Sequence, residues 1–189
     1  AGITLKTTMD LVGRFRKEDN ETPIILMGYY NPIFVYGIDE FIKDALTVGL
    51  DGLIIVDLPP EEDSELCIPA LNAGLDFIRL VAPTTDKNRL PYVLSNTSGF
   101  IYYISITGVT GAGGASHNSI EKAVKMVREN SELPIAVGFG IKTPDQAKRI
   151  SEIADAVVVG SAIISEIERT LTNEGSAADC TINNAHGLV

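Results

Sequence analysis

Six short runs of apolar, β-branched residues, separated by longer amphipathic stretches, constrain the fold of this 189-residue chain more than any other feature. The runs lack the alternation of apolar and polar residues typical of a half-exposed strand, as expected when both faces of a parallel strand are buried. They begin at Pro23 (PIILMGY), Gly52 (GLIIVDL), Asp76 (DFIRLVA), Gly99 (GFIYYIS), Pro134 (PIAVGFG) and Asp155 (DAVVVGS). Their starts lie about 29, 24, 23, 35 and 21 residues apart, which is the spacing of βαβ units and not of hairpins.

The stretches between these runs carry helical patterns. We predict helices over residues 5–16, 37–49, 59–74, 118–130 and 143–153. The last has the clearest start, because Thr143 is a favourable N-cap, Pro144 suits the first helical position and Asp145 suits the helix dipole.

Six strands of this kind fit either an open doubly wound sheet or most of an eight-stranded barrel. The helical pattern of residues 5–16 has no strand before it, so we expect the chain to open in the middle of a βα unit, which favours the barrel. We therefore predict an α/β fold, a (β/α)8 TIM barrel with about six of eight βα units, over residues 1–168. Residues 169–189 are small and polar, and we expect a divergent, poorly ordered tail there, or else a surface segment capped by a short helix.

The overall charge excludes some classes of partner. Fifteen Lys and Arg against twenty-five Asp and Glu give a net charge of -10, which argues against a non-specific surface for nucleic acid or anionic membrane. An anionic ligand must therefore be held locally, and backbone N–H groups at a helix N-terminus can do so.

The two cysteines, Cys67 and Cys180, show no metal-ligand or disulfide spacing. No apolar run approaches the roughly 18 residues of a membrane span, and the first four residues do not resemble a signal peptide. We expect a cytoplasmic protein, with organelle targeting left open.

Two glycine-containing strand ends are the strongest local signal for a ligand. They are Gly138-Phe139-Gly140 and Gly160-Ser161-Ala162, on the last two predicted strands. In barrel enzymes, the loops after the last two strands bring backbone N–H groups and a helix N-terminus to a phosphate. We predict a phosphate site here; the alternative is a pair of tight turns that need glycine.

A third glycine-rich segment, residues 107–116, follows the strand GFIYYIS. Such a loop can close as a lid, in which Thr110 would serve closure or orientation and Gly111 would reach the phosphate. A plain flexible connector is the alternative.

The other strand ends form a mostly apolar set, which suits an aromatic ligand with a phosphate tail or simply a protein core. The set comprises Met27, Tyr29, Ile54, Asp57, Leu80 and Tyr102. Asp57 is the best carboxylate candidate for a chemical role, but an Asp at such a junction often only accepts N–H bonds from a loop. His117 and His186 have no patterned partner, so no histidine-based catalysis is predicted.

A series of motifs, in order and spacing, resembles the α subunits of tryptophan synthase over about residues 1–168. The motifs are LMGYYNPI (26–33), GIDEF (37–41), DGLIIVDLPPEE (51–62), LVAPTTD (80–86), GVTGA (108–112), PIAVGFGIKTPDQA (134–147) and VVVGSAII (157–164). The resemblance implies a lyase that cleaves indole-3-glycerol phosphate to indole and glyceraldehyde 3-phosphate. It also implies a β subunit partner that carries pyridoxal phosphate, and no cofactor or metal in this chain.

The same resemblance assigns residues. Gly111, Gly140, Gly160 and Ser161 are expected to hold the phosphate. Tyr102, Thr110, Phe139, Ile54 and Met27 are expected near the indole. Asn31 and Pro59 are expected to face the β subunit.

The chain departs from the family pattern at its start. In the family, a Glu ends the second strand and an Asp follows in a PFSDPxADGP-like loop; neither occurs in this sequence. The catalytic acid and base are therefore unassigned here. This leaves open a catalytically dead chain, or a non-catalytic module that binds phosphate or the β subunit. A phosphosugar isomerase or epimerase is a further alternative. Such an enzyme would need its own catalytic residues or metal ligands at the strand ends, and Asp57 is the single candidate.

Overall fold

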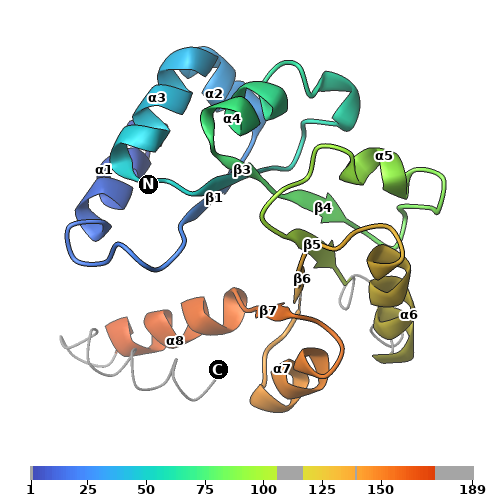
Figure 1. Ribbon diagram of the computed structural model, residues 1–189. Helices are drawn as coiled ribbons and strands as arrows, with labels where there is room; N and C mark the ends of the chain where they lie inside the picture. The colour runs from blue at the N-terminus through green and yellow to red at the C-terminus, as the bar shows by residue number, and fades with distance from the viewer. Residues whose placement is uncertain (1, 106–116, 139, 173–189) are drawn as a thin grey trace. The chain divides into compact units, whose positions relative to one another are not determined.

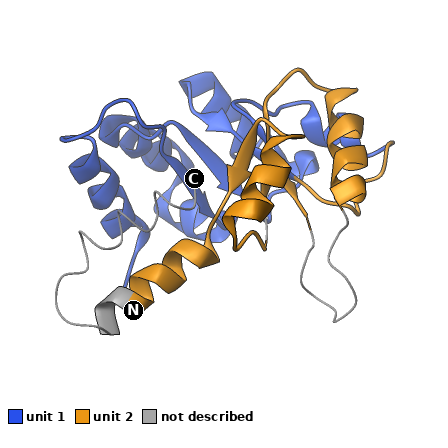
Figure 2. Ribbon diagram, turned by 90° about the horizontal axis from the view of Figure 1, so that it is seen from below, with its two compact units in different colours: residues 1–80, 88–101 blue, residues 81–87, 102–189 orange. Residues whose placement is uncertain are grey.

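The computed structural model describes residues 2–105, 117–138 and 140–172. Short parallel strands alternate with helices along this part of the chain (Figure 1). The chain divides into two compact units, residues 1–80 with 88–101 and residues 81–87 with 102–189 (Figure 2). Each unit is described by itself.

The first unit contains a three-stranded sheet in the order β1-β2-β3. Its elements are α1 (Leu5–Phe15), β1 (Ile25–Gly28), α2 (Tyr30–Tyr36), α3 (Ile38–Val48), β2 (Gly52–Ile55), the 3-10 helix η1 (Pro60–Glu62), α4 (Cys67–Ala73), β3 (Asp76–Phe77) and α5 (Leu90–Leu94). β1 pairs with β2 in parallel, with Ile25 opposite Gly52 and Gly28 opposite Ile55, and β2 pairs in parallel with β3.

The core of the first unit lies between the sheet and its helices. Leu53 and Ile55 lie two residues apart on β2, so their side chains share one face of the strand. They are buried in one cluster with Phe41 and Ala45 of α3. Met9 and Val12, three residues apart on α1, join the same cluster. The amphipathic stripes of the predicted helices therefore explain which face each helix buries.

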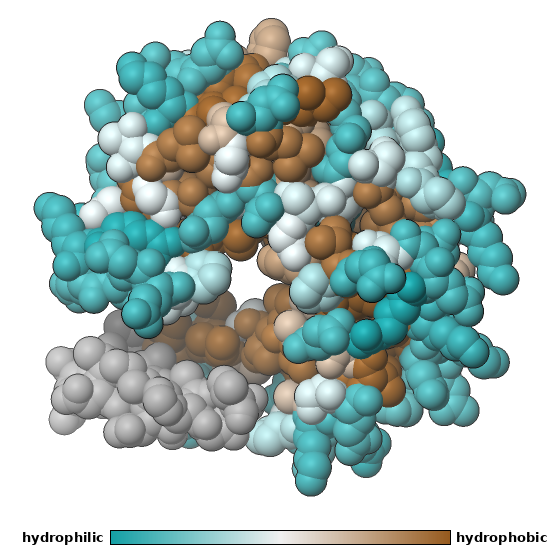
Figure 3. Space-filling view, viewed as in Figure 1, coloured by the Kyte–Doolittle hydropathy of each residue, from teal (hydrophilic) through white to brown (hydrophobic). Residues whose placement is uncertain are grey.

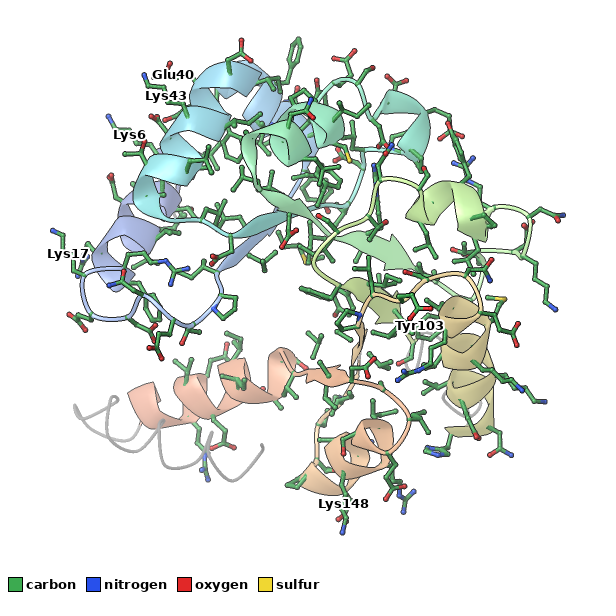
Figure 4. All side chains as sticks on the ribbon, viewed as in Figure 1. Lys6, Lys17, Glu40, Lys43, Tyr103 and Lys148 are labelled. Atoms are coloured by element: carbon green, nitrogen blue, oxygen red, sulfur yellow. The ribbon has the colours of Figure 1, made fainter. Side chains whose placement is uncertain are left out.

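The second sheet has the order β4-β5-β6-β7. The elements of this part of the chain are β4 (Arg79–Val81), β5 (Ile101–Ile104), α6 (His117–Arg128), β6 (Ile135–Gly138), α7 (Pro144–Ser151), β7 (Ala156–Val158) and α8 (Ser161–Thr172). Along β5 the side chains alternate, so that Tyr103 is buried in the interior (Figure 4) and Tyr102 is only half-buried.

The six predicted strands are all present, and those of each sheet are neighbours in chain order. The prediction of a parallel barrel-type order, and not an open sheet with a reversal, is therefore confirmed. The predicted strand at Asp76 is divided, because β3 pairs with β2 of the first sheet whereas β4 belongs to the second sheet.

Two predictions about helices were incomplete. The segment expected to be one helix over residues 59–74 instead forms η1 and then α4, with a turn between them. α2 and α5 were not predicted at all. The N-cap residue of α2, Tyr29, makes no side-chain cap hydrogen bond, and the helix contains Pro32 and the β-branched Ile33 and Val35, so its local propensity is weak.

Both units contain the same arrangement of an arginine and an aspartate. Asp51, just before β2, accepts hydrogen bonds from the Ile24 N–H (2.6 Å) and from Arg16 after α1. Asp155, just before β7, accepts from the Ile135 N–H (2.9 Å) and from Arg128 at the end of α6. In each unit the aspartate therefore joins the amino-terminal ends of two neighbouring strands to the helix that precedes the first of them, α1 in one unit and α6 in the other.

Candidate phosphate and substrate site

Three of the four predicted phosphate residues, Gly140, Gly160 and Ser161, lie at one edge of the second sheet. β6 and β7 are parallel, with Gly138 opposite Val158. Gly140 lies two residues after Gly138, and Gly160 lies two residues after Val158. Both glycines are therefore at the carboxyl edge of the sheet. Gly140 has a φ of 81°, a left-handed conformation that glycine adopts without strain.

α8 begins directly at this edge. The N–H groups of Ile163 and Ile164 donate to the Gly160 carbonyl (3.0 and 3.2 Å). Helix geometry leaves the N–H groups before them without intrahelical acceptors. Ser161 is exposed at the first helical position, and the first turn of this 12-residue helix contains no acidic residue. The positive end of the helix dipole is therefore free of competing negative charge from its own first turn.

Two side chains of β5 and its end shape the same edge. Ser105 donates to the Gly138 carbonyl through both its backbone N–H and its hydroxyl, each over 2.9 Å. Tyr102 lies so close that a Cβ at Gly138 would be 2.6 Å from the tyrosine hydroxyl oxygen. Burial raises the pKa of Tyr102, so its hydroxyl stays protonated at neutral pH.

In the first unit, Met27 and Ile54 are register partners on neighbouring strands. Partners in a parallel pair point to the same face. This face is opposite to that of Leu53 and Ile55, which pack under the helices. Met27 is 58% exposed and Ile54 is 6% exposed. The two predicted substrate residues are thus neighbours, and Met27 leaves apolar surface open.

Asp57, at the carboxyl end of β2, has the structural role that its position indicated. Its Oδ1 accepts a hydrogen bond from the Tyr30 N–H over 2.7 Å. Tyr30 is the first residue of α2, so the carboxylate caps this helix from a distance of 27 residues along the chain. This contact supports the interpretation of Asp57 as an acceptor of loop N–H groups.

The two predicted partner residues are both exposed near this strand end. Asn31 lies in the first turn of α2, and Pro59 immediately precedes η1. Phe34 and Val35 of α2 are 59% and 76% exposed. Apolar side chains reach the surface over α2 and α4 (Figure 3).

Three predicted site residues, Thr110, Gly111 and Phe139, lie outside the described residues, as does His186. His117 is the first residue of α6. Within the described ranges, no group of three or more His, Cys, Asp or Glu side chains could hold a metal ion. Across the same ranges, none of the helices combines the length and the apolar character that crossing a membrane requires.

Sequence reasoning missed two polar contacts in the structure. One is the pair of hydrogen bonds that Ser105 donates to the Gly138 carbonyl. The other is a buried network around Arg79, a basic residue inside an apolar run whose presence there was the available signal.

Parallel βα units, with a helix that begins at the carboxyl edge of the last described strands, define a (β/α)8-type α/β protein. The model of the family "Tryptophan synthase alpha chain" matches residues 1–188. The chain belongs to this family. The match continues past residue 168, into the segment where the resemblance was expected to end.

Solved structures of this family are similar to the chain. A tryptophan synthase alpha chain from Legionella pneumophila subsp. pneumophila shares 36% identity at a TM-score of 0.86, covering 98% of this chain and 68% of its own. The alpha subunit from Campylobacter jejuni shares 30% at a TM-score of 0.86, covering 100% and 72%. A structure of the tryptophan synthase a2b2 complex from Pyrococcus furiosus matches at 31% and a TM-score of 0.83, covering 99% and 73%. This chain thus spans about two thirds to three quarters of the length of these relatives.

Proposed function

We propose that this chain provides the phosphate-binding part of a tryptophan synthase α-type lyase, which cleaves indole-3-glycerol phosphate to indole and glyceraldehyde 3-phosphate in tryptophan biosynthesis. The observation that carries the proposal is the carboxyl edge of β6 and β7, where Gly140 and Gly160 follow paired strands and α8 begins at Ser161. Membership of the family supports the choice of substrate.

The reaction breaks the carbon–carbon bond between the indole ring and the glycerol chain. It requires a proton delivered to the ring and a proton removed from a hydroxyl group. In our proposal, backbone N–H groups at Gly140, Gly160 and the start of α8 hold the phosphate, together with the Ser161 hydroxyl. Gly111 would add to the phosphate site. Binding the phosphate positions the reacting bond, which is a large part of catalysis by proximity.

The apolar residues would receive the ring. Met27 and Ile54 offer an apolar strand face, and Tyr102 offers a half-buried aromatic face. Thr110 and Phe139 would complete this set. A mostly apolar pocket with a few polar anchors is the usual form of a small-molecule site.

We further propose a tryptophan synthase β subunit as the partner, docking near Asn31 and Pro59. The exposed apolar residues Phe34 and Val35 of α2 support this choice, because apolar side chains concentrate in the centres of protein interfaces. Pyridoxal phosphate would belong to that partner, and this chain would need no cofactor. The cytoplasm, where such biosynthesis takes place, is the proposed location.

Substrate competition tests the proposed function. The 189-residue chain is titrated with a non-cleavable indole alkyl phosphate, and indole-3-glycerol phosphate or a ketose phosphate is then added as competitor. We expect indole-3-glycerol phosphate to displace the probe and the ketose phosphate to be at least about tenfold weaker, because only the former fills the apolar face. Displacement by the ketose phosphate alone would contradict the proposal and favour a phosphosugar enzyme.

Indole release is measured in the same samples, with and without a β subunit. The family's Glu and Asp motif does not occur in these 189 residues. We therefore expect release at least about 10³-fold slower than by a relative that has both carboxylates, since each acid or base typically contributes about 10² to 10⁴. Release at the relative's rate would show that a group present here, with Asp57 tested first as Asp57→Asn, transfers the proton.

A further inference from the structure

A buried ionic network lies beneath the segment that follows β2. Arg79, on β4, and Asp63, after η1, form an ion pair and are each only 5% exposed. The Asn96 side-chain amide donates to the other oxygen of Asp63 over 2.8 Å. The Arg79 guanidinium also lies over the Phe77 ring, 4.6 Å from its centroid.

The network also reaches the backbone of the strand end. Arg79 Nη1 donates to the Leu58 carbonyl over 2.6 Å. Leu58 stands between Asp57, which caps α2, and Pro59, the proposed partner residue. One guanidinium thus bonds to both ends of the segment Leu58–Asp63.

Stability alone is a poor explanation for this network. Desolvating two charges commonly costs as much as their attraction returns, so a buried pair often adds no net stability over apolar residues. Burial lowers the pKa of Arg79 only to about 10, so the guanidinium stays charged at neutral pH. Its Nε–H is buried and donates to no acceptor among the described residues, and an unsatisfied buried donor is destabilising. The distinct consequence of the network is therefore the geometry that it fixes.

We propose that Arg79 is a positioning residue, which through the Leu58 carbonyl and Asp63 holds the segment Asp57–Leu66 in the conformation that presents Pro59 and the start of α2 to the β subunit. The partner rests on the proposed function; the local ordering does not. The segment's own backbone bonds are short-range turns, such as Glu62 N–H to the Pro59 carbonyl at 2.9 Å. Arg79 ties these turns to β4 at two points, the Leu58 carbonyl and the Asp63 carboxylate.

The test separates positioning from stability. Arg79→Met alone would leave the Asp63 charge buried and unpaired, which destabilises strongly. The main variant is therefore Arg79→Met combined with Asp63→Leu, in which apolar residues of similar size replace the pair. Arg89→Met is the matched control, because it removes the exposed ion pair with Glu61 of the same segment.

Amide hydrogen exchange of the 189-residue chain is the first readout. In the double variant we expect exchange at Glu62, Glu65 and Tyr30 to rise by about tenfold or more, since a lost hydrogen bond to a charged group allows local opening. Exchange in β2 should stay unchanged, and so should the whole profile of the Arg89→Met control. Wild-type protection of the segment in a folded double variant would overturn the proposal, as would an equal loss of protection throughout the first unit.

Affinity for the β subunit is the second readout, with binding of the indole alkyl phosphate probe as a check on the rest of the fold. We expect the double variant to bind the β subunit at least about tenfold more weakly and to bind the probe normally. Equal β-subunit affinity in a variant whose segment has become mobile would overturn the presenting role. If the wild-type chain bound no β subunit, the proposed partner would fail, while the exchange result would still decide whether Arg79 orders the segment.

Discussion

Gly138 shows how closely the strands of the second sheet approach one another. A Cβ built there would lie 2.6 Å from the Tyr102 hydroxyl oxygen and 2.7 Å from the Val158 Cβ. No side chain larger than hydrogen fits without a shift of β5 or β7. The glycine at this position therefore permits a close approach between neighbouring strands.

Gly138→Ala should therefore lower the free energy of unfolding by about 1 to 3 kcal/mol, the usual cost of overpacking. Gly28→Ala is the control, because it also ends a strand but a Cβ there meets nothing within 4 Å. The control should change stability by less than about 0.5 kcal/mol. Urea unfolding measures both, and an equal effect of the two changes would show that crowding at Gly138 is relieved at no cost.

Asp155 illustrates a carboxylate that stabilises through its charge. The Ile135 N–H, and then Arg128, hold its pKa below the ordinary 3.8. Because the folded-state pKa is depressed, its contribution is present above pH 3.8 and is lost as the pH falls through the lower folded value. Asp155→Asn should therefore unfold at lower urea than wild type at pH 7, and the difference should shrink as the pH falls below 3.8. A difference that stayed constant over this range would exclude a charge effect.

At the scale of elements, the sequence predicted best where local signals agree with packing. α7 begins as predicted, with Thr143 as N-cap and Pro144 in the first turn, and the structure adds a capping box with Gln146. α2 could not be predicted in the same way, because its start depends on Asp57, a residue 27 positions away. The break between η1 and α4 likewise coincides with the buried pair of Asp63 and Arg79, which no local pattern indicates.

Thr143→Ala should cost about 1 kcal/mol of unfolding free energy, since the Gln146 N–H loses its acceptor. Lys148→Ala on the same helix is the control, because Lys148 projects away from the body of its unit (Figure 4) and is exposed. The control should stay within about 0.5 kcal/mol of wild type. If Thr143→Ala were equally neutral, the capping box would contribute nothing to stability.

At the scale of the whole molecule, the order of strands and the fold class were predictable because βα units follow one another with short connections. The family followed from a series of motifs, none of which is specific alone. The site was predictable only in part. Glycines at strand ends predict a phosphate site, which stays a proposal, but the contacts of Ser105 and Arg79 arise between residues more than 15 positions apart.

Binding of a phosphate ester tests the central claim most directly. Calorimetry compares the indole alkyl phosphate with the corresponding alcohol, for the wild-type chain, Ser161→Asp and Ser165→Asp. An Asp in the first turn favours the helix dipole, so Ser161→Asp should remain folded while its charge repels the phosphate. Ser165 is exposed one turn further along α8 and serves as the control. We expect the wild type and Ser165→Asp to prefer the ester over the alcohol, and Ser161→Asp to lose at least about tenfold in affinity for the ester, since repulsion at close range exceeds about 1.4 kcal/mol. Equal binding of ester and alcohol by the wild type, or an unchanged affinity of Ser161→Asp for the ester, would contradict a phosphate site at the N-terminus of α8.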